Sequence, residues 1–170
     1  MAAWGSTSMS RAALALAAAL TATPALAASP DEAAVGKTLD AFHAAAAHSD
    51  FKGYFDLFTP DGVFIGTDAH ERWTVPAFRA YAKPAFDAKK GWVYVPRSRH
   101  VTIAATPCRC VAYFDELLGS KAYGTSRGTG VLIKGAHGWR IAQYALTFPI
   151  PNDLARDMTD RIKAYEAKAK

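Results

Sequence analysis

Side chains that could transfer a proton occur in two short groups, and the first follows a short apolar run at residues 63–65. It consists of Asp68, His70, Glu71 and Arg72. A carboxylate close to an imidazole can pair with it and make a proton shuttle near neutral pH. The same residue types also collect in solvated loops, where Asp68 would support a turn and Glu71 would pair with Arg72. We favour the polar loop, and keep Asp68 and His70 as candidate catalytic residues.

The second group is Asp115 and Glu116, adjacent residues inside a run that is apolar on both sides. Successive side chains of a strand point to opposite faces, so one carboxylate should face the interior. An inward carboxyl in apolar surroundings has a raised pKa and can act as a general acid or hydrogen-bond donor. The alternative is a structural ion pair with Arg99 or Arg127. The sequence does not decide which of the two acids points inward.

Arg97, Arg99 and Arg127 lie on predicted strands and could converge in a concave site. Guanidinium groups bind carboxylates in a bidentate manner, which would suit an anionic small molecule. On an exposed sheet face the same residues would be solvated positive charges or subunit contacts, and we favour this second interpretation.

Aromatic residues are spread along the chain and could line an apolar cavity with a few polar tips, which is typical of a ligand site. Most of them must also form the core of a small domain. As candidate ligand contacts we take Tyr54, Trp73, Tyr81, Trp92, Tyr94 and Tyr144. His43 flanks the apolar stripe of the first predicted helix, where a hydrogen-bonded core or surface histidine is the simpler interpretation.

The first 27 residues are typical of a secretory signal peptide. Arg11 precedes an apolar run at residues 12–20, and Ala25 and Ala27 stand at the two positions that a signal peptidase recognises. The run is about half of the ~20 residues that span a bilayer, so we expect no membrane span after signal removal. The sequence therefore predicts an exported protein, periplasmic or secreted, with one domain at residues 28–170.

The elements that must position these side chains are predicted in a simple order. Helical periodicity with Ser29 as the cap predicts a helix that ends near His48, followed by a short helical segment at residues 50–58. A turn at residues 59–62, a strand at 63–66 and a helix capped by Thr74 come next. Four antiparallel strands at 92–105, 108–118, 122–134 and 139–148 lead to a last helix after Asn152.

Cys108 and Cys110 are the only cysteines, separated by one residue in a predicted strand. The Cα atoms of residues two apart on a strand are about 6.5 Å apart, near the upper limit for a disulfide. We favour two small half-buried side chains over a redox role, and keep a labile bridge as the alternative for an exported protein.

Several function classes are disfavoured. The net charge of +5 is modest and spread along the chain, without the basic stripe and interleaved aromatics of a nucleic-acid-binding surface. The chain has no nucleophile elbow, phosphate loop, dinucleotide fingerprint or paired-histidine zinc motif. We therefore expect no nucleic-acid partner, no metal and no cofactor.

The arrangement resembles the nuclear-transport-factor-2-like superfamily, and more narrowly its SnoaL-like branch. The likeness is carried by the first helix through Phe42, by the segments 59–65 and 67–73, and by the strands at 128–133 and 138–141. This resemblance implies an α+β fold in which N-terminal helices pack on the concave face of a curved antiparallel sheet and form a cone. The helix after Asn152 is extra to that cone.

The same resemblance implies frequent homodimers through the exposed sheet face. Its members include isomerases, dehydratases, epoxide hydrolases, polyketide cyclases and non-catalytic modules, so function must be argued from the site. Our leading hypothesis is an exported protein that binds a small, partly apolar molecule in an internal pocket. The alternatives are a cofactor-free acid/base lyase, isomerase or hydrolase, and a dimerisation module with a vestigial pocket.

Overall fold

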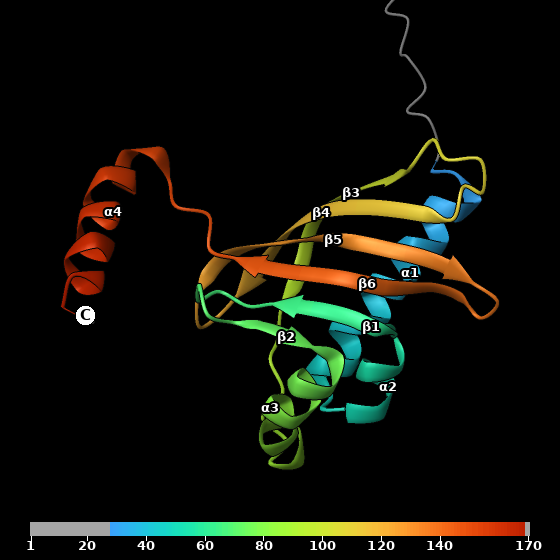
Figure 1. The fold of residues 1–170 in the computed structure, drawn as a ribbon, viewed down its shortest axis with the longest axis horizontal. Coiled ribbons are helices and arrows are strands. Elements are labelled where there is room, and N and C mark those ends of the chain that lie inside the picture. The colour runs from blue at the N-terminus through green and yellow to red at the C-terminus, as the bar shows by residue number, and fades with distance from the viewer. Residues whose placement is uncertain (1–27, 169–170) are drawn as a thin grey trace, which may run out of the picture.

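The computed structural model describes residues 28–168, so the predicted signal peptide lies outside the described residues. Figure 1 shows helices beside a twisted sheet, with one further helix set apart. The helices are α1 (Pro30–Ala47), α2 (Phe51–Asp56), α3 (Val75–Asp87) and α4 (Asn152–Glu166). The strands are β1 (Phe58–Ile65), β2 (Arg72–Thr74), β3 (Val95–Ile103), β4 (Val111–Ser120), β5 (Gly124–Gly135) and β6 (Gly138–Thr147). The predicted α+β class and the predicted succession of elements are confirmed, apart from the short strand β2.

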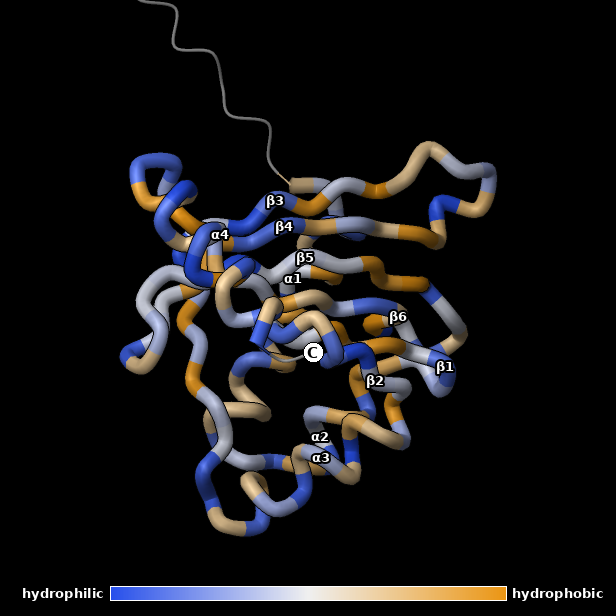
Figure 2. Tube along the Cα trace, turned by 60° about the vertical axis from the view of Figure 1, so that its left-hand side comes forward, coloured by the Kyte–Doolittle hydropathy of each residue, from blue (hydrophilic) through white to orange (hydrophobic). Residues whose placement is uncertain are grey.

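The six strands form one open sheet in the order β2-β1-β6-β5-β4-β3 (Figure 2). The predicted meander is present, because β3 to β6 pair with their neighbours in an antiparallel manner. Strand β1 adds to β6 in the parallel direction, so the sheet is mixed rather than purely antiparallel. The β5–β6 hairpin closes at Gly135 and Gly138, and Gly138 has a φ of +92° that favours glycine.

Two local predictions differ from the structure near β1. Residues 59–62, predicted as a turn, are an irregular stretch inside β1: Phe58 pairs with Ile141, and Val63 pairs with Gln143. The chain thus bulges without leaving the sheet, as extra residues on one strand commonly do. The segment before α3 was not expected to pair. It forms β2, in which Trp73 lies opposite Phe64 of β1.

Helix α1 begins where the sequence predicts it. Ser29 and Glu32 form a capping box, in which the Glu32 backbone N–H donates to Ser29 Oγ and the Ser29 N–H donates to Glu32 Oε2. The buried positions Val35, Leu39 and Phe42 then recur at helical spacing. This stripe packs with α2 and α3 against the inner face of the sheet, so that the core lies between the helices and the sheet.

The β3–β4 connection corrects the interpretation of the two cysteines. Cys108 and Cys110 form a disulfide, and their Cα atoms are 5.1 Å apart. They lie in a loop before β4 rather than in a strand, and Arg109 between them has a φ of +46°. This left-handed turn brings the two Cα atoms closer together than an extended strand would. The disulfide can therefore form, although the predicted strand had disfavoured it.

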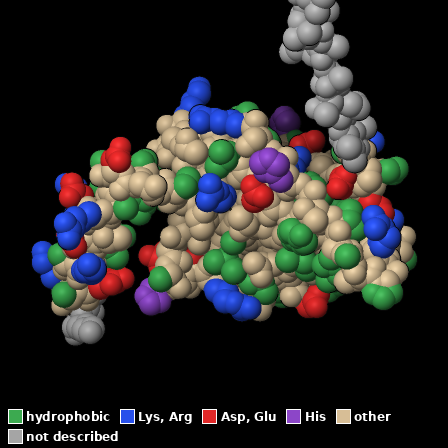
Figure 3. All heavy atoms as spheres, turned by 90° about the horizontal axis from the view of Figure 1, so that it is seen from above, with side chains coloured by type: hydrophobic (Ala, Val, Ile, Leu, Met, Phe, Trp, Pro, Cys, Tyr) green, Lys and Arg blue, Asp and Glu red, His purple; other side chains and the backbone are tan. Residues whose placement is uncertain are grey.

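Helix α4 stands apart from the sheet, and side chains of both charge signs cover it in Figure 3. Its predicted apolar residues Leu154, Ile162 and Tyr165 are 48%, 48% and 75% exposed, and none of its residues is buried. Pro151, not Asn152, occupies the N-cap position. Within residues 28–168, no helix has the length and apolar character needed to cross a membrane.

Because no α4 residue is buried, we expect truncation after Pro151 to change the free energy of unfolding by less than about 0.5 kcal/mol. Chemical denaturation measures this, with Leu39→Ala in the core as the control that should cost about 3 kcal/mol. A truncation cost comparable to that of the core control would contradict the expectation. A cost that grows at higher protein concentration would show that α4 packs on a second copy.

Candidate functional site

One acidic side chain, Glu116, is fully buried beneath the sheet. On β4 the alternation places Phe114, Glu116 and Leu118 inward, whereas Asp115 faces outward. Asp115 is 55% exposed and contacts His100 on the neighbouring strand, with 3.2 Å between Oδ2 and Nδ1. Of the two predicted acids, the structure therefore places Glu116 inside and Asp115 on the outer face.

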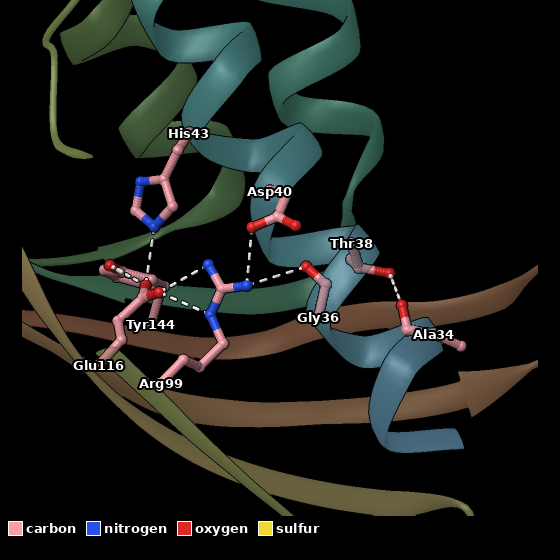
Figure 4. Close-up of polar contacts among 8 residues, drawn as sticks. All are labelled: Ala34, Gly36, Thr38, Asp40, His43, Arg99, Glu116 and Tyr144. Atoms are coloured by element: carbon pink, nitrogen blue, oxygen red, sulfur yellow. Dashed lines mark hydrogen bonds and ion pairs between the residues drawn. The ribbon is translucent and has the colours of Figure 1, made fainter. Parts of the chain in front are cut away.

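The Glu116 carboxylate is contacted from three elements (Figure 4). On Oε1, the His43 Nε2 of α1 lies at 2.7 Å and the Tyr144 hydroxyl of β6 donates a hydrogen bond of 3.0 Å. On Oε2, Arg99 Nε of β3 donates a hydrogen bond of 2.8 Å. Arg99 Nη2 is also 2.8 Å from Oε2, but it lacks hydrogen-bond alignment, so this contact is an ion pair without a second directed bond.

Arg99 links this carboxylate to α1. Its Nη1 donates to Asp40 Oδ1 at 2.7 Å and to the Gly36 carbonyl at 3.1 Å. Arg99 is only 14% exposed on its side chain, while Asp40 is 66% exposed. The result is a chain of charges, Asp40–Arg99–Glu116, with His43 at its inner end.

The register of the sheet makes room for this cluster. Arg99 and Gly128 are the cross-strand neighbours of Glu116 on β3 and β5. A Cβ atom on Gly128 would lie 2.2 Å from the Tyr144 hydroxyl and 3.0 Å from Glu116 Oε1. Gly128 is needed here because any side chain would displace the Tyr144 hydroxyl from the carboxylate.

Electrostatics keep Glu116 ionised. Burial acts to raise the pKa of Glu116, but the hydrogen bond from His43 and the charge and hydrogen bond of Arg99 outweigh it and lower the pKa below its ordinary value of 4.5. The sequence argument expected the opposite direction, because it considered apolar surroundings without these partners. Burial, followed by the neighbouring Glu116 charge, raises the pKa of Tyr144 well above 10, so Tyr144 remains a hydrogen-bond donor.

Two cavities lie next to one another on the inner side of the cluster. The inner one is about 20 Å³, and His43, Tyr54 and Tyr144 are among its lining residues. The outer one is about 260 Å³ and opens to solvent. Both are lined by Phe64, Trp92, Tyr94 and Leu146, so they share a wall. The outer cavity thus leads from the surface toward the buried cluster.

The hydroxyl of Tyr54 is an unusual feature of the inner cavity. Tyr54 is 0% exposed, and its hydroxyl makes no well-aligned hydrogen bond among the described residues, although the neighbouring Trp92 indole acts to lower its pKa as a nearby donor would. Burial raises the pKa of Tyr54 well above 10, so the hydroxyl keeps its proton. Buried hydroxyls normally have a partner, and this one is therefore available to a bound molecule.

The other predicted residues divide between the cavities and the surface. Trp73, Tyr81, Trp92 and Tyr94 line the outer cavity. Arg97 lines an adjoining surface groove, and Arg127, on the outer face of β5, is exposed. Because only Arg99 lies inside, the three arginines do not converge on a common site. Asp68 and His70 are exposed in the loop before β2, where the His70 backbone N–H donates to Asp68 Oδ1, and they line neither cavity.

The sequence interpretation underrated His43 and missed Asp40. His43 lies next to Phe42 and four residues after Leu39, on the buried side of α1. That position was the available signal, since a buried imidazole requires a polar partner. Asp40 gave no such signal, because its partner Arg99 is 59 residues away on β3. Within residues 28–168, no group of three or more metal-ligating side chains is assembled.

Comparison with known proteins yields one family and a set of similar folds. A model of the SnoaL-like domain matches residues 35–151. An NTF2-like protein of unknown function from Pseudomonas putida KT2440 has a TM-score of 0.59 and 15% identity, over 71% of this chain and 88% of that chain. A candidate dehydratase of the NTF2-like family from Streptomyces avermitilis has a TM-score of 0.60 and 14% identity, over 71% of this chain and 97% of that chain.

An NTF2-like protein with a cystatin-like fold from Novosphingobium aromaticivorans has a TM-score of 0.57 and 14% identity, over 75% of this chain and 87% of that chain. The comparison with curated proteins gave no match. At these identities the similar structures establish the fold and not the chemistry.

We expect Glu116→Gln to lower the free energy of unfolding by about 3 kcal/mol at neutral pH, because it leaves Arg99 and His43 without the charge they pair with. The folded-state pKa of Glu116 is lowered, so its stabilisation is fully present above pH 4.5 and is lost as the pH falls through the folded-state pKa. The difference between wild type and variant should therefore shrink on acidification, as measured by denaturant titrations across this range. Asp115→Asn on the outer face is the matched control, with an expected change within about 0.5 kcal/mol. A difference that stays constant with pH would show that the Glu116 charge contributes nothing.

Proposed function

The chain belongs to the SnoaL-like domain family, and we propose that it binds one small, partly apolar molecule in the two neighbouring cavities. The observation that carries this proposal is the outer cavity of about 260 Å³, which is open to solvent, lined mostly by aromatic side chains, and adjacent to the inner cavity that the buried Tyr54 hydroxyl lines. Ligand sites commonly combine an apolar wall with a few placed polar groups.

The volumes limit the size and orientation of that molecule. The inner cavity of about 20 Å³ has room for little more than one water molecule. The body of a ligand must therefore occupy the outer cavity, and only a small polar group can reach Tyr54 and His43. The outer cavity, at about 260 Å³, is slightly smaller than the usual range of about 300–1,000 Å³, which favours a ligand of one or two rings.

We expect Trp73→Ala to weaken binding by about tenfold, because Trp73 stacks on Tyr81 with ring centroids 4.6 Å apart and forms a wall of the outer cavity. Native mass spectrometry of protein purified from its own host would detect a retained ligand and the subunit number. Tyr113→Ala is the control, since Tyr113 is 52% exposed outside both cavities. Wild-type protein without a retained or rebinding ligand would favour a dimerisation module with a vestigial pocket.

A second candidate function is acid/base catalysis on the bound molecule, supported by the contact between His43 and Glu116. The ionised carboxylate can only accept, so it assigns the proton of His43 to Nε2. In the neutral imidazole Nδ1 is then the unprotonated nitrogen, which belongs to a side chain that lines the inner cavity and has no partner among the described residues. A proton taken by Nδ1 produces an imidazolium that the Glu116 carboxylate stabilises.

Tyr54 completes this arrangement. Its unpartnered hydroxyl, which lines the same inner cavity, can donate a hydrogen bond to an oxygen that becomes negative when a neighbouring C–H bond is broken. The pair is therefore suited to proton transfer next to a carbonyl, a step shared by isomerases and lyases.

If His43 is the base, the ligand identified by mass spectrometry should exchange a C–H proton for deuterium in heavy water in the presence of the protein. We expect His43→Gln to reduce this exchange by at least about 100-fold, because general-base catalysis contributes roughly 10²–10⁴. His48→Gln is the matched control at the exposed end of α1, where His48 only bonds the Ala44 carbonyl. Equal exchange in both variants would remove His43 from the mechanism and leave the binding proposal intact.

A further inference from the structure

The outer cavity has an unusual composition for a general apolar site. Eight of its twelve lining residues are aromatic: Phe64, Trp73, Phe78, Tyr81, Trp92, Tyr94, Tyr123 and Phe148. Among residues 28–168, Glu71 is the one carboxylate that lines this cavity, and no lysine, arginine or histidine lines it. The positive side chains of Arg97 and Lys121 line the adjoining surface groove instead.

The aromatic rings come from several separate elements of the fold. Trp73 of β2 stacks on Tyr81 of α3 at 4.6 Å. Tyr123, in the turn between β4 and β5, stacks on Phe148 after β6, with ring centroids 5.0 Å apart. Aromatic faces carry partial negative charge, so a ring of each stack whose outer face lines the cavity can attract a cation placed there.

The Glu71 carboxylate is held at the same cavity by local backbone. The Asp68 backbone N–H donates to Glu71 Oε2 at 3.1 Å, and the Gly66 N–H donates to the Glu71 carbonyl at 2.8 Å. A Cβ atom on Gly66 would lie 2.2 Å from Glu71 Oε2, so the carboxylate is folded over this glycine. Within residues 28–168 Glu71 makes no ion pair, although the sequence suggested one with Arg72.

From these observations we infer that the outer cavity binds an organic cation, an alkylammonium or quaternary ammonium group carried on a small apolar body. The aromatic faces and the Glu71 carboxylate attract positive charge, and no basic side chain lines the cavity to repel it. An anionic group would face the same rings and carboxylate without a counter-charge. This inference rests on the proposed function, because it specifies the charge of the molecule bound there.

Three probes of one shape and different charge test this inference on the full chain. Benzyltrimethylammonium is the cation, neopentylbenzene is its neutral carbon isostere, and phenylmethanesulfonate is an anion with a similar tetrahedral head. Binding is followed by tryptophan fluorescence, since Trp73 and Trp92 line the cavity, and by calorimetry. We expect the cation to bind roughly tenfold more tightly than the neutral isostere, in the range of cation–π attraction, and the anion to bind most weakly.

The variant Glu71→Gln should lower the preference for the cation over the neutral isostere by about fivefold while binding the isostere as wild type does. Asp115→Asn, which removes a negative charge on the outer face, should leave the preference unchanged. Equal affinities for cation and isostere, or a preference for the sulfonate, would overturn the cationic ligand and keep the proposed cavity. Absence of binding by all three probes would overturn the cavity as a binding site, and this inference with it.

Discussion

The fold depends on one electrostatic constraint, the burial of the Glu116 carboxylate. An ionised carboxylate beneath a sheet is costly unless its oxygens are satisfied, and removing a single partner is more damaging than replacing the whole group. Here Oε1 accepts hydrogen bonds from His43 and Tyr144, and Oε2 accepts one from Arg99. These partners come from α1, β3 and β6. The contacts of the Glu116 carboxylate therefore connect the first helix to two strands that flank β4 and β5 in the sheet.

Backbone geometry makes this joining possible. Arg99 and Glu116 are direct cross-strand neighbours, and a shift of one residue along β4 would bring Asp115 inward and turn Glu116 to solvent. Gly128 on the next strand leaves the space in which the Tyr144 hydroxyl meets the carboxylate. The buried position of the Glu116 carboxylate therefore depends on the register in which β3, β4 and β5 pair. Helix α4 takes no part in this arrangement.

Local signals explain how much the sequence could predict. Ser29 and Glu32 marked the start of α1 within three residues of each other, and the period-two pattern marked the meander. By contrast, the inward direction of Glu116, the parallel pairing of Phe58 with Ile141 and the pairing of Asp40 with Arg99 each depend on distant segments meeting. The cysteine bridge depended on the left-handed turn at Arg109, a non-glycine residue whose type gives little warning of that conformation.

The sign of the interior charge connects the proposals for this site. Asp40 and Glu116 carry two negative charges against the one positive charge of Arg99, so the cluster is negative by one while His43 is neutral. A proton that His43 takes from a bound molecule would cancel that charge. Glu71 adds negative charge at the outer cavity, which no basic side chain lines. The inner cluster and the outer cavity thus both favour positive charge, and a ligand with a cationic group in the outer cavity and a polar group near Tyr54 would match both.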